Sequence, residues 1–199
     1  MPYSQFSIDV IKTSFGVTIS EKVGIFAELP EIEPSKLLQE TLQFNIPIAL
    51  AINSEKSRSE MIISPILIEL KKRYPDRISL FSGKEFNVDP EKGLIGFCDF
   101  LISRSSEQLF IEAPVIIIVE AKNDNIEVGL GQCMAEMVAS QLFNQRRGNE
   151  IHQIYGVVTN GSNWKFMRLE GQVFEIDLNE YFVDRVGKIL SILSSGIES

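Results

Sequence analysis

Three charged side chains, Asp99, Glu120 and Lys122, lie within or directly after apolar segments of the sequence. Asp99 stands inside residues 93–102, and Glu120 and Lys122 end residues 114–122. The second segment is almost continuously β-branched, which is typical of a strand buried on both faces. Because side chains alternate along a strand, the sequence predicts two shared faces: Phe97, Asp99 and Leu101 in the first strand, and Ile116, Ile118, Glu120 and Lys122 in the second. If the two strands pair as neighbours, Asp99 lies close to Glu120 and Lys122.

Two neighbouring carboxylates at the edge of a core need positive charge. Burying an unpaired charge costs roughly several kcal/mol, and Asp99 and Glu120 also repel each other. Lys122 supplies one positive charge, and a divalent metal ion would supply the rest. Hard oxygen ligands favour Mg²⁺ or Mn²⁺ over zinc.

This arrangement resembles the PD-(D/E)XK nuclease superfamily, in which an Asp is followed further along the chain by Glu-x-Lys at the end of an apolar strand. The resemblance implies a restriction-endonuclease-like fold and hydrolysis of nucleic acid, with DNA as the favoured substrate. Carried over, Asp99 and Glu120 hold Mg²⁺ or Mn²⁺, the backbone carbonyl of Ala121 adds a third oxygen, and Lys122 orients or activates the attacking water. One position departs from the family pattern, because Cys98 and not proline precedes Asp99.

Two further site residues follow from the same resemblance. Glu60, on the helix before the core strands, corresponds to an acidic residue that often joins the metal site. The alternative is an exposed first-turn carboxylate that the helix dipole favours. Gln132, on the helix after Lys122, matches the start of a Gln-x-x-x-Tyr pattern whose last position is Glu136 here. Glu136 equally suits a salt-bridged surface residue.

The charged cluster also has a purely structural interpretation, a strand-end salt bridge between Asp99 and Lys122 with Glu120 solvated. The formal net charge of −8 counts against a nuclease too, because nucleic-acid binders usually present basic surfaces. A nuclease with this net charge would need a homodimer, a partner protein or a local basic patch to provide affinity for nucleic acid. The alternative function is therefore a catalytically inactive nuclease-fold module that binds a protein or nucleic-acid partner.

Composition limits the remaining classes. With 199 residues, of which 44% are hydrophobic, the chain suits one domain or one domain with an appendage. The single histidine argues against zinc sites and histidine-based triads. Cys98 and Cys133 lie in apolar surroundings, so we expect them to be buried and reduced. There is no secretory signal and no apolar run of membrane-spanning length, which together predict a cytoplasmic protein with no membrane partner.

The predicted fold is α/β, with a central mixed β-sheet flanked by helices. Residues 1–45 form an N-terminal helical extension, and residues 46–199 form the nuclease-like domain. Within the extension we expect a short helix, a short strand and a second helix from Ser35. Residues 46–53 suit either a strand or a buried helix.

The next helix begins at Ser57 or Ser54 and ends before Pro75, with a bend at Pro65. Strands are expected at residues 78–88, 108–112, 151–158, 164–169 and 172–176, and helices at residues 128–144 and 179–194. Lys165 and Arg168 are interpreted as a solvated strand face, with phosphate contact as the alternative.

Overall fold

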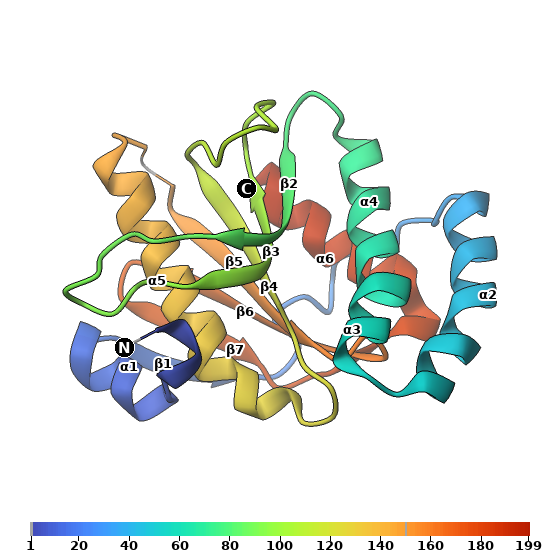
Figure 1. Cartoon of the computed structure of the whole chain (residues 1–199), viewed down its shortest axis with the longest axis horizontal. Helices are drawn as coiled ribbons and strands as arrows, with labels where there is room; N and C mark the ends of the chain where they lie inside the picture. Colours follow the sequence, from blue (N-terminus) through green and yellow to red (C-terminus); the bar gives the residue numbers. More distant parts are fainter. Residues whose placement is uncertain (1, 150) are drawn as a thin grey trace.

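The computed structural model describes residues 2–149 and 151–199, and it is an α/β fold built on one mixed eight-stranded sheet (Figure 1). The strand order is β1-β7-β6-β5-β4-β3-β2, and β8 pairs with β6 beside this path. The strands are β1 (Thr18–Lys22), β2 (Ser79–Glu85), β3 (Phe97–Ser103), β4 (Val115–Ala121), β5 (Gln153–Thr159), β6 (Asn163–Glu170), β7 (Val173–Asp177) and β8 (Tyr181–Phe182). The predicted class and the central mixed sheet are confirmed.

Helices cover both faces of this sheet. The α-helices are α1 (Ile8–Phe15), α2 (Lys36–Ile52), α3 (Glu55–Arg58), α4 (Ser64–Arg73), α5 (Leu130–Arg146) and α6 (Val186–Glu198). Short segments complete them: η1 (Tyr3–Gln5), the π-helical η2 (Ser59–Ile63), η3 (Ile126–Gly129) and η4 (Val183–Arg185). None of the helices in residues 2–149 and 151–199 is both long and apolar enough to cross a bilayer.

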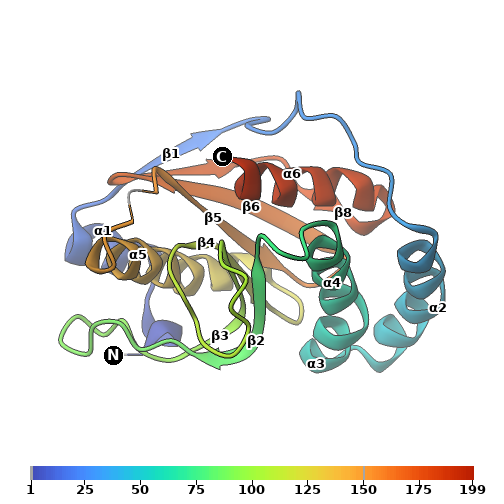
Figure 2. The same cartoon turned by 90° about the horizontal axis from the view of Figure 1, so that it is seen from above.

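The sheet separates two apolar cores. One core joins α2, α4 and α6 to side chains such as Ile117, Val119 and Trp164. The other joins α1 and α5 to side chains such as Leu101 and Ile118. Figure 2 shows α5 and α6 on opposite sides of the strands. The strand β4 is buried along its whole length, as its β-branched sequence predicts.

The parallel pair β4 and β5 is joined through η3 and α5, and it forms the centre of the sheet. The pairs β2–β3 and β3–β4 are antiparallel. The connection between β2 and β3 reaches along α5, where Phe86 packs edge-on against Phe143 and Arg146 forms an ion pair with Asp89 at 2.8 Å. As a result α5 is enclosed between the sheet and this connection.

The N-terminal residues join the sheet. The predicted short helix and strand are α1 and β1, and β1 pairs in parallel with β7. Tyr3 is buried in the core around α5, and its hydroxyl donates to the Phe86 carbonyl at 2.6 Å. The boundary predicted at residue 45 falls inside α2, since residues 46–52 continue that helix and are not a strand.

The helical region before β2 begins at Ser54 and not at Ser57. Ser54 caps α3, and Ser57 completes the capping box from inside the helix. Pro65 has no N–H to donate to the Met61 carbonyl one turn earlier, and the chain widens to the π-helical η2 just before it. The Asn45 side chain donates to that carbonyl instead, at 2.9 Å.

Two predicted elements are wrong. Residues 108–112 form no strand; there the Gln108 side chain bonds both backbone groups of Leu80 and so covers the sheet edge. The final helix begins at Val186 and not near residue 179, because residues 181–182 pair with β6 first. Gly83, inside β2, has a positive φ of +58°, a backbone conformation that glycine adopts without steric cost.

Candidate metal and catalytic site

The candidate site lies where β3 separates from β4. The last paired residues of the two strands are Phe100 and Val119, whereas β3 stays paired with β2 as far as Phe97. Beyond the last pair, the backbone N–H of Ala121 donates to Asp99 Oδ2 at 2.8 Å. The Asp99 carboxylate therefore takes the place of a backbone acceptor and marks the opening between the two strands.

The side chains of β3 do not alternate between the faces as predicted. Cys98 and Leu101 both pack into the core around α5, so strict alternation fails between them, and Phe97 is exposed to solvent. A register shift at Ile102 and Ser103 has a similar effect on β4. Ile116 consequently packs with the α6 side of the sheet and not with Ile118.

Glu120 follows the last β3–β4 pair and is buried, with 1% of its surface exposed. Its Oε1 accepts from the Lys122 ammonium, and its Oε2 has no partner in the part of the chain that the structure describes. Burial, and then the nearby Asp99 charge, raise the pKa of Glu120 to about 8, against the lowering effect of Lys122. The alternative of an Asp99–Lys122 salt bridge with a solvated Glu120 is wrong.

Lys122 is held between two acceptors. Besides Glu120, its ammonium donates to Gln132 Oε1 at 3.4 Å. Burial by itself lowers the pKa of Lys122, but the Glu120 carboxylate more than offsets this and raises the pKa above its ordinary value. Lys122 is therefore a charged hydrogen-bond donor at neutral pH.

Glu136 lies behind Gln132 and is fully buried, so its interpretation as a surface residue is wrong. Gln132 Nε2 donates to Glu136 Oε1 at 3.1 Å, which turns the amide oxygen of Gln132 toward Lys122. Glu136 Oε2 has no partner among the described residues. Burial, and then the Glu120 charge, raise the pKa of Glu136 well above its ordinary value. The spacing of Gln132 and Glu136 was visible in the sequence, but the burial of Glu136 was not.

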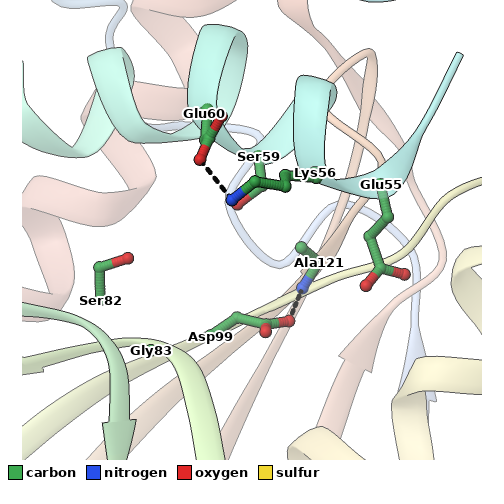
Figure 3. Close-up of a pocket in the computed structure, with 8 residues that line it drawn as sticks. All are labelled: Glu55, Lys56, Ser59, Glu60, Ser82, Gly83, Asp99 and Ala121. Atoms are coloured by element: carbon green, nitrogen blue, oxygen red, sulfur yellow. Dashed lines mark hydrogen bonds and ion pairs between the residues drawn. The ribbon is translucent and has the colours of Figure 1, made fainter. Parts of the chain in front are cut away.

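A pocket of about 260 Å³ opens in front of Asp99 (Figure 3). Its lining residues are Glu55, Lys56, Ser59 and Glu60 from α3 and η2, Ser82 and Gly83 from β2, Asp99 from β3, and Ala121 from β4. Glu120 does not line the pocket; it lies beside Asp99 on the buried side of the opening.

The acidic residues of the pocket differ in what they face. Glu60, the predicted fourth metal ligand, forms an exposed ion pair with Lys56 at 2.7 Å, and its carboxylate points toward the Lys56 ammonium (Figure 3). Glu55 lies nearer the Ala121 side of the pocket, and its charge contributes to the raised pKa of Glu120. Sequence reasoning missed Glu55; the signal was Ser54, whose role as helix cap places Glu55 in the first turn.

The donor set suits a divalent ion that keeps part of its water shell. Within residues 2–149 and 151–199, no group of three or more His, Cys, Asp or Glu side chains is placed to hold a metal ion. Mg²⁺, however, is commonly bound through one or two carboxylates together with several waters. Asp99 and the unpartnered Oε2 of Glu120 provide two such oxygens, and Ala121 lines the pocket next to them. The residues present therefore fit the ion that the sequence predicts.

The basic residues of β6 lie outside this pocket. Lys165 is buried, so its interpretation as part of a solvated face is wrong. In the sheet, Lys165 of β6 pairs with Val158 of β5, and Val158 pairs in turn with Glu120 of β4. Arg168 forms an ion pair with Glu175. Neither of them adds a basic approach to Asp99.

Cys98 and Cys133 are buried and unpaired, as predicted. Burial raises the pKa of each thiol well above the usual value for cysteine, so both thiols stay protonated and unreactive.

No family model, curated protein or solved structure matches this chain significantly. The function is therefore inferred from the site itself.

Proposed function

We propose that this protein is a metal-dependent nuclease of the PD-(D/E)XK type with a restriction-endonuclease-like fold. The observation that carries the proposal is that the two carboxylate oxygens of Glu120 differ. Oε1 accepts a hydrogen bond from Lys122, and Oε2 has no partner among the described residues. One carboxylate can thus hold the lysine and a metal ion at the same time. Asp99 lies beside it at the opening between β3 and β4, next to a pocket of about 260 Å³.

The residues divide the chemistry of phosphodiester hydrolysis. Asp99, Glu120 and the Ala121 carbonyl would hold Mg²⁺ or Mn²⁺, which when bound polarises the phosphate and acidifies water. Lys122 donates hydrogen bonds to the attacking oxygen and stabilises negative charge as it develops on the phosphate. Gln132 keeps the Lys122 ammonium in place, and Glu136 fixes the orientation of the Gln132 amide. Glu60 faces Lys56, so Glu55 is the better candidate for an additional acidic residue.

The test separates metal binding from chemistry. We expect isothermal titration calorimetry to show Mn²⁺ binding to the wild type and none to Glu120→Gln, because the amide removes one of two ligand charges. Cleavage of mixed plasmid and single-stranded DNA should require Mg²⁺ or Mn²⁺ and should also be lost in Glu120→Gln. Full cleavage activity in Glu120→Gln would contradict the proposed metal-dependent mechanism.

One observation favours a second function, a nuclease-fold module that binds a partner without cleavage. The rim of the pocket is mainly acidic, with Glu55 and Glu60 exposed and Lys56 as the single basic residue of the lining. Nucleic acid approaching Asp99 would meet this charge. A wild type that binds no Mn²⁺ and cleaves no nucleic acid would favour this second function.

A further inference from the structure

One flank of α2 carries a stripe of side chains that are exposed and apolar, except for the partly buried Thr41. The stripe consists of Leu37, Thr41, Phe44, Ile48 and Ile52, which follow one another at intervals of three or four residues. Of these, Phe44 is 72% exposed, and Leu37 and Ile52 are more than half exposed. Intervals of three and four place the side chains on one line along a helix, as in the contact seam of a coiled coil.

The neighbouring face of α2, roughly a quarter-turn around the helix from the stripe, accounts for its packing within the chain. Leu38, Leu42 and Ala49 are buried against the core that contains α4. The sequence from Thr41 to Ser54 holds no charged residue, so the C-terminal part of α2 is apolar on its outer side as well. A helix that is apolar on both sides is normally covered on both sides. Figures 1 and 2 show α2 at the edge of the molecule, where none of the described residues covers its outer side.

The stripe borders a shallow apolar groove between α2 and α4. The groove has a volume of about 210 Å³ and is lined by Leu37, Leu38, Thr41, Pro65, Ile68, Glu69 and Lys72. Ile68 is partly exposed there and widens the apolar surface beyond α2. The surface is therefore a ridge with a groove beside it, which is the shape that a second helix fits.

We propose that this surface binds a second copy of the same chain, with the two α2 helices packed antiparallel about a two-fold axis between Phe44 and Ile48. A two-fold contact requires a self-complementary patch, and the stripe is uncharged over its whole length, so its two halves match when one copy is reversed. Phe44 of each copy then packs against Ile48 of the other.

Charge favours this place of contact and this orientation, although the net charge of each copy opposes association in general. Each chain carries a net charge of −8, and two copies meet with least repulsion along an uncharged stripe. Lys72 lies beside the start of α2, and Glu55 follows the end of α2. At the start of the helix, Lys36 also pairs with Glu40 at 3.6 Å. An antiparallel pair brings Lys72 of one copy toward Glu55 of the other, and it opposes the two helix dipoles favourably.

The exposed apolar area reaches the lower limit for a specific contact. A fully exposed large side chain presents about 150–250 Å² if aromatic and somewhat less if aliphatic. On that scale the stripe together with Ile68 presents about 500 Å² of apolar surface per copy, which is at the upper end for a monomer. Two copies would bury about 1,000 Å² from these side chains alone, which meets the minimum for a specific interface.

The experiment is sedimentation equilibrium of the full chain over a range of concentrations. We expect the wild type to form dimers, and Phe44→Lys to weaken association by about tenfold or more, as for a residue near the centre of an interface. Ile52→Lys, at the end of the stripe, should weaken association by a smaller factor. The matched control is Phe110→Lys, since Phe110 is 69% exposed but lies in the loop between β3 and β4. The control should dimerise like the wild type. Circular dichroism melting confirms that each variant is folded.

Two results would overturn the proposal. One is a wild type that stays monomeric at about 100 µM, which would exclude even a weak dimer and leave the stripe to a different partner. The other is a dimer that Phe44→Lys and Ile52→Lys leave unchanged. Neither result bears on the metal site, so this proposal and the nuclease proposal fail separately.

Cysteine cross-linking tests the orientation. Mixing Phe44→Cys with Ile48→Cys should give the mixed disulfide under mild oxidation, because an antiparallel pair places these positions opposite each other. Leu37→Cys alone should stay uncross-linked, since the two copies of residue 37 then lie at opposite ends of the interface. Efficient cross-linking of Leu37→Cys would overturn the antiparallel arrangement.

Discussion

The two sides of Asp99 differ in whether their charged side chains are buried or exposed. On the α5 side, Glu120 and Glu136 are buried, and each has one carboxylate oxygen without a partner among the described residues. On the α3 side, Glu60 and Lys56 form an exposed pair in solvent. Buried, incompletely paired carboxylates reduce stability, whereas exposed pairs contribute little in either direction. The α5 side is therefore maintained at a cost in folding free energy, which supports our proposal that the chemistry takes place on that side.

The largest expected effect comes from removing the lysine of the α5 side. Lys122→Ala should lower the cleavage rate by about 10²–10³-fold, the usual loss for one group that stabilises transition-state charge. Mn²⁺ affinity should stay within about threefold, since Glu120 Oε2 and Asp99 remain available. Single-turnover cleavage and calorimetry measure the two quantities. A variant that loses metal binding and cleavage together would mean that Lys122 only stabilises the fold of the site.

The next effect concerns stability and pH. Burial holds the pKa of Glu136 well above its ordinary value, so the unfolded chain releases this proton at a lower pH than the folded chain does. Below the ordinary pKa of a glutamate, Glu136 is protonated in both states and does not reduce stability. As the pH rises from that ordinary pKa toward the raised pKa of the folded protein, the free energy of unfolding falls. Glu136→Gln should remove this loss.

Glu136→Gln should therefore be more stable than the wild type by about 1–3 kcal/mol at pH 8, the usual cost of an unsatisfied buried group. The difference should disappear near pH 4. Urea denaturation at both pH values measures it. A variant that is less stable at pH 8 would show that Glu136 is a stabilising ionised group.

A matched pair of variants compares the two acidic residues of the pocket. Glu55→Gln should weaken Mn²⁺ binding by about threefold to tenfold, because this charge is close enough to affect Glu120. Glu60→Gln should change it by less than twofold or so, since Glu60 faces Lys56 and solvent screens the pair. Calorimetry at low salt gives both values. The reverse order would restore Glu60 as the metal-site residue that the sequence predicted.

The smallest effect is expected from the exposed ion pair itself. Lys56→Gln removes a surface pair on one helical turn, and such pairs contribute about 0.3–0.5 kcal/mol. The free energy of unfolding should fall by no more than that amount in urea denaturation. A larger fall would show that the two sides of Asp99 are more alike than the structure implies.

The parts of the site that depend on local pattern could be predicted from the sequence. The β-branched run identified β4, and alternation placed Glu120 and Lys122 on one face beside Asp99. Their approach follows from the pairing of β3 with β4, which adjacent strands in the chain favour. The position of Gln132 followed from helical spacing alone.

The parts that depend on tertiary packing could not be predicted. Glu136 is buried beside a core that includes Tyr3 from the far end of the chain, and no local pattern encodes that packing. Ile116 changed faces because of a bulge, which a regular alternation cannot anticipate. Residues 108–112 have an apolar, strand-like composition, but the Gln108 side chain and not the backbone bonds the sheet edge there.

The most direct test of the proposed metal site is a crystal of the protein soaked in Mn²⁺ and examined by anomalous scattering. We expect one manganese between Asp99 and Glu120 Oε2, within about 2.0–2.3 Å of their oxygens, the range of hard-ligand sites. Lys122 should remain bonded to Glu120 Oε1. An empty site, with Lys122 bridging both carboxylates, would contradict the proposed mechanism and identify the cluster as a structural ion-pair network.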